Sequence, residues 1–431
     1  MIGACLIASL ITVSAPSADE VHWWRSREFT NATELIQRAL DDVWKGGGGT
    51  VRIAKGFYPI RGLRMRSNTT LYLESGAVLS ASRRSGDFRT VRNEPKGNDG
   101  IIRIVGERNV AIIGEKGSVI DGNNGYDPDG EEHYRGVHGI SVTSVSNLTL
   151  RGYTIQHTGN WAHRLTWVRG LICENLTVLA GHDGINFHHC DNVQIRDCRI
   201  ETGDDSIAGC DNNDVDIRRC RFSSACQIFR FAGHNVLIED CMAKGPCRYV
   251  FRGSLTPQAK RDGVWDPALV SGRHSTAAFF CYMSVRKCVP RRPPSGIVIR
   301  NCEVEGCARL LRYNFTNEPW QEEVPLEDIR FENVKARDLW LPLAAYGGDS
   351  SRYAPARLEL ESCNLSFNKP VESLIEGGNM SNIVLTNVSV DGVTDEVFRS
   401  WDGDCHIVGQ DVQGVKLETR KCSGRFSCPV R

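Results

Sequence analysis

Short segments in which apolar and polar residues alternate recur along this chain. The clearest copies read NVQIRDCRI from Asn192, DVDIRRCRF from Asp214 and NVLIEDCMA from Asn235, and their starts lie 22 and 21 residues apart. Alternation with a period of two is typical of a β-strand with one buried face. Looser copies begin at Asn109, Asn147, Asn175, Gly296, Asp328, Arg357 and Asn382. The pattern therefore predicts many short strands over most of the chain.

The spacing of these strands predicts how they are arranged. A repeat of about 20–25 residues leaves no room for the helical crossovers of a doubly wound sheet, whereas it suits a solenoid whose repeats stack on one another. Leucine-rich repeats share this period, but their Leu-rich consensus is missing from the sequence. We therefore predict an all-β fold, the right-handed parallel β-helix, in which each coil of short strands stacks on the next.

The ends of a solenoid must be covered, because an open coil exposes its core. Residues 31–45 have the apolar period of an amphipathic helix, and the glycine run 46–49 ends it. We predict that this helix caps the N-terminal end of the core. The apolar residues expected on its buried face are Leu35, Ile36, Leu40, Val43 and Trp44.

One long segment interrupts the repeats. No copy of the phrase occurs at about residues 254–295, and this segment is rich in basic residues such as Arg273 and Arg291. Long segments of this kind are usually functional or disordered, and this one follows the coils of the candidate site, where it could wall one side of a cleft. We predict a single β-helix domain over residues 19–431 that contains this loop.

Residues 1–18 allow two interpretations. Their apolar stretch resembles the core of a signal peptide, although it has no preceding Lys or Arg. Alternatively, ITVSA from Ile11 forms the first strand of the fold. A secreted or extracellular location is favoured, and a cytoplasmic one stays open.

The charge and the hydropathy of the chain argue against some classes of binding partner. The chain has 52 basic and 52 acidic residues, a balance that argues against nucleic acid or an anionic membrane as the main partner. No apolar run reaches the roughly 18 residues of a transmembrane helix. We expect a monomer.

Five of the 17 cysteines can be interpreted from their positions. Cys198, Cys220 and Cys241 occupy one position of the three clearest repeats, so we expect a ladder of reduced, semi-buried thiols. Cys422 and Cys428 are better candidates for a disulfide. Because no CxxC pair has zinc-like spacing, we expect no metal site.

Two short strings carry candidate chemistry: HDGI from His182 and DDSI from Asp204. Asp183 and Asp205 are 22 residues apart, which is one coil, and equivalent residues of stacked strands lie about 4.8 Å apart. Asp204 stands beside them. Such close carboxylates repel one another, so at least one should have a raised pKa and hold a proton near neutral pH, as glycoside hydrolysis requires. Gly-Asp-Asp is otherwise often a turn, but the stack with Asp183 favours catalysis.

The same strings resemble the motifs of glycoside hydrolase family 28, the polygalacturonase family of the pectin-lyase-like superfamily. Gly203-Asp204-Asp205 and Asp183-Gly184-Ile185 resemble two family motifs, and SNTTLYLESGAVL from Ser67 and VIDGNNG from Val119 are also similar, so that the resemblance covers roughly residues 31–400. It implies inverting hydrolysis without a cofactor. Asp204 would be the general acid, and Asp183 and Asp205 would activate the water.

Two further motifs of the family are altered. Its Gly-His-Gly falls on residues 225–227, which read Ala-Cys-Gln, and its Arg-Ile-Lys falls on residues 247–252. Arg248, Arg252 or Arg230 could replace the missing basic group. In the family this group holds a substrate carboxylate, so we expect that unbranched polygalacturonate is a poor substrate.

Two aromatic residues near the aspartates are further candidates for substrate binding. His182 flanks Asp183, and Trp161 precedes it by 22 residues, so Trp161 is expected to stack one coil below. The expected partner is a plant or microbial poly- or oligosaccharide, with a pectin-related glycan favoured. Two alternatives stay open: a Ca²⁺-dependent polysaccharide lyase that uses Arg230 or Arg248 as its base, and a non-catalytic carbohydrate-binding or adhesion solenoid.

Overall fold

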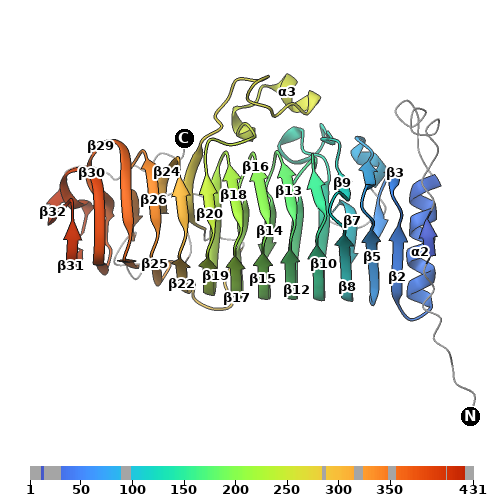
Figure 1. Ribbon diagram of the computed structural model, residues 1–431, viewed down its shortest axis with the longest axis horizontal. Coiled ribbons are helices and arrows are strands. Elements are labelled where there is room, and N and C mark those ends of the chain that lie inside the picture. The colour runs from blue at the N-terminus through green and yellow to red at the C-terminus, as the bar shows by residue number, and fades with distance from the viewer. Residues whose placement is uncertain are drawn as a thin grey trace, which may run out of the picture. The chain divides into compact units, whose positions relative to one another are not determined.

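The computed structural model describes residues 11–13, 31–88, 99–283, 288–314, 324–347, 356–403 and 405–422. The regular structure is almost entirely short parallel strands (Figure 1). The chain divides into two compact units, residues 1–182 with 256–264 and residues 183–255 with 265–431. Each unit is a stack of parallel coils, so the predicted right-handed parallel β-helix is confirmed. That the coils form one domain stays a prediction.

In the first unit, one column of buried residues shows how the coils stack. Val51, Leu71, Ile112, Leu150 and Cys173 are in register on successive parallel strands, and all are fully buried. The elements of this unit are β1 (Ile11–Val13), α2 (Asn31–Lys45), β2 (Gly49–Ile53), β3 (Gly56–Ile60), β4 (Leu63–Arg64), β5 (Thr69–Leu73), β6 (Ala77–Ala81), β7 (Gly100–Val105), β8 (Arg108–Gly114), β9 (Val119–Asp121), β10 (His138–Arg151), β11 (Thr154–Gln156), β12 (His163–Glu174), β13 (Thr177–Ala180) and α3 (Pro257–Asp262).

The second unit continues the same construction. Ile195, Ile217, Ile238, Ile299 and Phe331 form its equivalent buried column. Its strands are β14 (Ile185–His188), β15 (Asp191–Arg196), β16 (Arg199–Thr202), β17 (Ile207–Arg218), β18 (Arg221–Ser224), β19 (Gln227–Glu239), β20 (Met242–Lys244), β21 (Thr276–Tyr282), β22 (Ser295–Arg300), β23 (Glu303–Glu305), β24 (Cys307–Asn314), β25 (Asp328–Glu332), β26 (Lys335–Leu339), β27 (Leu343–Tyr346), β28 (Arg357–Glu361), β29 (Asn364–Gly378), β30 (Asn382–Asp402), β31 (His406–Gln413) and β32 (Lys416–Lys421).

The asparagine or aspartate that opens each repeat phrase has a backbone role. Asn192, Asp214 and Asn235 all have φ of 55°, in the left-handed region that these two residue types tolerate best. Asn235 also donates a hydrogen bond from Nδ2 to Oδ1 of Asp214, at 2.7 Å. The residue therefore makes the turn into each strand and ties that turn to the coil before it.

The predicted capping helix is present as α2, which packs against β2, β3, β4 and β5 (Figure 1). Ile36, Leu40 and Val43 are buried as expected, together with Ala32 and Ala39. The prediction was wrong for Leu35 and Trp44, which are exposed. At 100° per residue they lie roughly 80–100° from the centre of the buried face, at its two margins. Instead, the guanidinium carbon of Arg66 lies 4.8 Å from the centre of the Trp44 ring.

The segment without repeats contains regular structure. A 3₁₀ turn at Arg252–Ser254 is followed by α3, which packs in the first unit, with Lys260 Nζ 4.4 Å above the ring of Tyr134. In the second unit, β21 pairs with β19 and β24, so a coil resumes at Thr276. Near the N-terminus, β1 pairs with β2, and both interpretations of residues 1–18 stay predictions. Across the described residues, no helix is long and apolar enough to cross a membrane.

Candidate active site

The 22-residue spacing of the aspartates places them in register. Ile185 on β14 pairs with Ile207 on β17, and the N–H of Gly184 donates to the carbonyl oxygen of Asp205 at 2.9 Å. Asp183 and Asp205 therefore hold equivalent positions on consecutive coils. On the next coil this position is Gln227, whose backbone N–H donates to Oδ1 of Asp205 at 3.2 Å. The structure thus brings the predicted aspartates into one column.

Asp204 completes a cluster of three buried carboxylates. Asp183, Asp204 and Asp205 are each at most 5% exposed. One oxygen of Asp204, one oxygen of Asp205 and the sulfur of Cys226 all lie within 4.8 Å of one another. Buried charges at this distance are costly unless cations or protons compensate them.

Two arginines provide positive charge. Arg230 on β19 lies in register with Ala208 on β17, and its Nε is 2.7 Å from Oδ2 of Asp205. Arg252, at the start of the segment without repeats, contacts Oδ2 of Asp204 through its own Nε. Two predicted substrate-binding residues therefore pair with two predicted catalytic residues.

Protons compensate the rest of the charge. Burial raises the pKa of Asp183 to about 8, and the negative charges of Asp204 and Asp205 add to this rise, whereas Arg230 opposes it. Burial likewise raises the pKa of Asp205 to about 6, against the effect of Arg230. Oδ2 of Asp183 accepts a hydrogen bond from Asn186 at 2.7 Å, while its buried Oδ1 has no hydrogen-bond partner among the described residues. Asp183 thus holds a proton near neutral pH, as expected for clustered carboxylates.

The remaining predicted residues lie in other surroundings. Arg248 is more than half exposed, and its Nη1 lies 3.8 Å from Oε2 of Glu201. In the first unit, the ring of His182 lies 5.7 Å from that of Tyr134, and the ring of Trp161 lies 5.1 Å from that of His138. The substrate-binding roles of Arg248, His182 and Trp161 stay predictions.

Asn186 and Cys226 also belong to the cluster, although neither was predicted as a site residue. Asn186 fixes the orientation of Asp183, and the signal for it was available, because it shares a register position with Ala208 and Arg230. Cys226 lies beside Asp204 and Asp205, and burial raises the pKa of its thiol well above the usual value. A neutral thiol therefore lies next to these two carboxylates.

The three cysteines of the repeat are free, as expected. Cys198, Cys220 and Cys241 are fully buried, however, where the sequence predicted semi-buried thiols. The sulfur of Cys220 lies 3.8 Å from the carbonyl oxygen of Ile195, one coil earlier. Cys428 lies outside the described residues, so its disulfide with Cys422 stays a prediction.

Comparison with known proteins relates this site to a family. Residues 69–226 match the model of glycosyl hydrolases family 28. A probable polygalacturonase of Vitis vinifera is 25% identical over 197 residues, which make up 41% of this chain and 40% of that protein. The match therefore spans well under two thirds of that relative's length.

Two solved structures share the fold. The family 28 exopolygalacturonase of Yersinia enterocolitica has a TM-score of 0.58 at 15% identity, over 89% of this chain and 76% of its own. The polygalacturonase of Erwinia carotovora has a TM-score of 0.53 at 15% identity, over 95% and 99%. At these identities the likeness shows the fold alone. The predicted resemblance is confirmed: the segment that carries Asp183, Asp204 and Asp205 is similar to glycosyl hydrolases family 28, and the chain has the parallel β-helix fold of solved polygalacturonases.

Proposed function

We propose that this protein is a glycoside hydrolase that cleaves a pectin-related glycan by an inverting mechanism. The observation that carries the proposal is the cluster of three buried carboxylates, one of them protonated near neutral pH, within the segment similar to glycosyl hydrolases family 28. Hydrolysis of a glycosidic bond needs one carboxylic acid for the leaving oxygen and one carboxylate for the water. The cluster offers both forms at once.

The assignment of roles follows the resemblance. Asp204 protonates the leaving oxygen, and Asp183 and Asp205 activate the water on the opposite face of the sugar. Because Arg252 contacts Asp204, the bound substrate must draw this guanidinium away before Asp204 can carry a proton. The raised pKa of Asp183 supports a competing assignment in which Asp183 is the acid. The competing assignment uses the same three carboxylates.

The substrate is proposed to differ from unbranched polygalacturonate. A polyanion of that kind needs cations that can reach its carboxylates. Arg230 and Arg252 are the two predicted basic groups at the cluster, and both pair with its aspartates. A neutral or sparsely charged pectic side chain suits this arrangement better.

The lyase alternative is less well supported. Ca²⁺ takes six to eight oxygen ligands, whereas two of the aspartates already face guanidinium groups. A lyase base must also lose its proton. Burial lowers the pKa of Arg230, but the charges of Asp205, Asp183 and Asp204 outweigh burial and raise it overall, so Arg230 stays protonated.

A reducing-end assay over neutral, branched and acidic pectic glycans tests the proposal. We expect new reducing ends from at least one neutral or branched glycan, undiminished by EDTA, with much slower release from polygalacturonate. The Asp205→Asn variant serves as the blank. Turnover of polygalacturonate equal to that of the best substrate contradicts the substrate class. EDTA-sensitive release of products that absorb in the ultraviolet supports a lyase, and binding without any release supports the non-catalytic alternative.

A further inference from the structure

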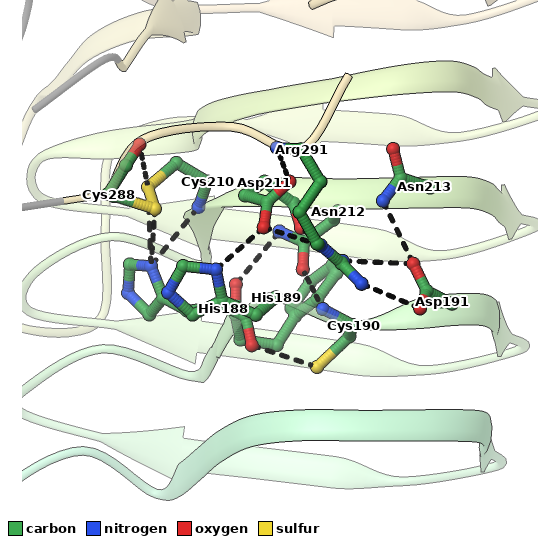
Figure 2. Close-up of polar contacts among 11 residues, drawn as sticks. His188, His189, Cys190, Asp191, Cys210, Asp211, Asn212, Asn213, Cys288 and Arg291 are labelled. Carbon is green, nitrogen blue, oxygen red and sulfur yellow. Dashed lines mark hydrogen bonds and ion pairs between the residues drawn. A yellow bond between two sulfur atoms is a disulfide. The ribbon is translucent and has the colours of Figure 1, made fainter.

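A second cluster of reactive side chains lies in the second unit, where the segment without repeats returns to the coils (Figure 2). Cys210 on β17 forms a disulfide with Cys288, 78 residues later in the chain. His188, at the end of β14, points its Nδ1 at both sulfur atoms. This atom lies 3.5 Å from Sγ of Cys210 and 3.8 Å from Sγ of Cys288.

We propose that His188, Cys210 and Cys288 bind a zinc ion when the disulfide is reduced. Zinc takes a tetrahedral set of nitrogen and sulfur ligands, with Zn–N of about 2.0–2.1 Å and Zn–S of about 2.3 Å. In such a set the ligand nitrogen and each ligand sulfur lie roughly 3.6 Å apart. The two nitrogen–sulfur distances of the cluster already fit this geometry, and only the sulfurs need to separate, to roughly 3.8 Å.

The ring nitrogen of His188 has the protonation that a ligand needs. The backbone N–H of Cys210 donates to Nδ1 of His188 at 3.3 Å, so Nδ1 carries a lone pair and any ring proton lies on Nε2. A metal-bound imidazole must be unprotonated at the ligating atom. Zinc takes up this lone pair in place of the N–H of Cys210.

Contacts other than the disulfide hold Cys288 in place. Three residues further on, Arg291 donates to Asp211 from its backbone N–H at 2.7 Å and from Nε at 2.8 Å. Its Nη1 and Nη2 reach the two carboxylate oxygens of Asp191 at 2.8 and 2.9 Å. Asp211 also lies 2.6 Å from Nδ1 of His189 (Figure 2). When the sulfur–sulfur bond is cleaved, the segment that contains Cys288 and Arg291 therefore stays attached to β15 and β17.

The site has an oxidised state, which is the disulfide, and a reduced state, which binds zinc. A dithiol or phosphine reductant supplies two electrons, two protons complete the thiols of Cys210 and Cys288, and the reductant is oxidised. Zinc then binds the two thiolates and releases two protons. The resulting site is neutral and has three protein ligands, which leaves the fourth position to water. A small-molecule disulfide takes up two electrons and two protons to become two thiols, which restores the disulfide of Cys210 and Cys288 and releases the zinc ion.

The sequence spacing did not reveal these ligands. His188 and Cys210 are 22 residues apart, and they share a register position because Ile185 pairs with Ile207. Cys288 joins them only through the fold. The expectation of no metal site rested on CxxC spacing, which does not detect ligands that a solenoid brings together across coils.

A metal titration tests the proposal independently of any glycosidase activity. The full chain is reduced with a phosphine, freed of metal and titrated with Cd²⁺, whose bonds to thiolates absorb in the ultraviolet, and then with Zn²⁺ as competitor. We expect one equivalent of Cd²⁺ bound by the reduced protein and none at this site in the oxidised protein. Cys288→Ser and His188→Ala should each weaken binding at least tenfold. Cys302→Ser, which alters another free and buried thiol, is the matched control and should bind normally.

Each outcome decides the proposal. A thermal shift of the reduced wild-type protein with Zn²⁺, absent from Cys288→Ser, confirms that the metal binds the folded state. Failure of the reduced protein to bind either metal overturns the proposal, as does equal binding by wild type and both ligand variants. Equal binding by the oxidised protein also overturns it, since the disulfide leaves no thiolates.

Discussion

The same three coils of the second unit stack residues in two contrasting ways. In one column, Cys198, Cys220 and Cys241 repeat a free, buried thiol on every coil. In another column, Asp183 and Asp205 repeat a carboxylate, and the third coil changes to Gln227. The cysteine therefore recurs on all three coils, whereas the aspartate recurs on only two.

Electrostatic energy explains the difference. Thiols one coil apart remain neutral, because the hydrogen bond that Cys220 and Cys241 each donate to the thiol one coil earlier, together with burial, raises their pKa. Aspartates one coil apart repel each other in a water-poor environment, so they need a proton on Asp183 and the cation of Arg230. A stacked pair of buried charges is thus a costly arrangement, and such perturbed groups cluster at functional sites.

The largest expected effect is the loss of catalysis when the charged column is neutralised. Asp204→Asn and Asp205→Asn should each lower kcat by at least about 100-fold, since each removes a proposed acid or base. The fold should persist, because an amide keeps the shape of the side chain without its charge. Steady-state kinetics and circular dichroism measure both, and NMR of the first product should show an inverted anomer. Asp216→Asn, on the outer side of β17, is the control that should retain full activity. Retained anomeric configuration or near-normal kcat contradicts the assignment.

A substrate with a good leaving group should show whether Asp204 or Asp183 is the general acid. A nitrophenolate leaves without a proton, so a variant that lacks only the general acid recovers activity on a nitrophenyl glycoside. We expect Asp204→Asn to lose about tenfold or less on that substrate, and Asp183→Asn to lose activity equally on both substrates. The reverse result identifies Asp183, whose pKa is about 8, as the acid. Comparing kcat for the two substrates in both variants decides between them.

The sequence predicted the parts of this comparison that repeat. The 22-residue period placed Asp183 with Asp205 and Cys198 with Cys220, because register in a solenoid follows directly from spacing. It named Arg252 only as one of three candidate basic groups, without its contact to Asp204 48 residues earlier, and it did not identify Cys288, because neither residue lies in a repeat phrase. Leu35 and Trp44 were misplaced for a different reason, since a helical period defines a face but not its width.

A third, smaller effect concerns stability and pH. The pKa of Asp183 is raised in the folded state above its usual 3.8, so the folded state binds the extra proton and loses stability as pH rises from about 4 to about 8. Asp183→Asn removes this loss. Its free energy of unfolding should exceed that of wild type by about 1 kcal/mol or more at pH 8, and by less at pH 5.

Denaturant titrations of both proteins at the two pH values measure this difference. Asp197→Asn should show the opposite sign, because a hydrogen bond from Arg219 lowers the pKa of Asp197, so this carboxylate stabilises the fold above its unfolded pKa. An advantage of Asp183→Asn that stays constant with pH shows that its origin is not the buried proton.

The smallest effect is expected in the neutral column. Cys220→Ser keeps a small neutral donor where the thiol now faces the carbonyl oxygens of Arg218 and Ile195, at 3.3 and 3.8 Å. We expect the free energy of unfolding to fall by less than about 1 kcal/mol, because the hydroxyl can bond to the same oxygens, and kcat to stay unchanged. Urea titration and the reducing-end assay measure the two quantities. A large loss of kcat contradicts the contrast between the two columns, since it means that the ladder and the carboxylate cluster are coupled through the coils they share.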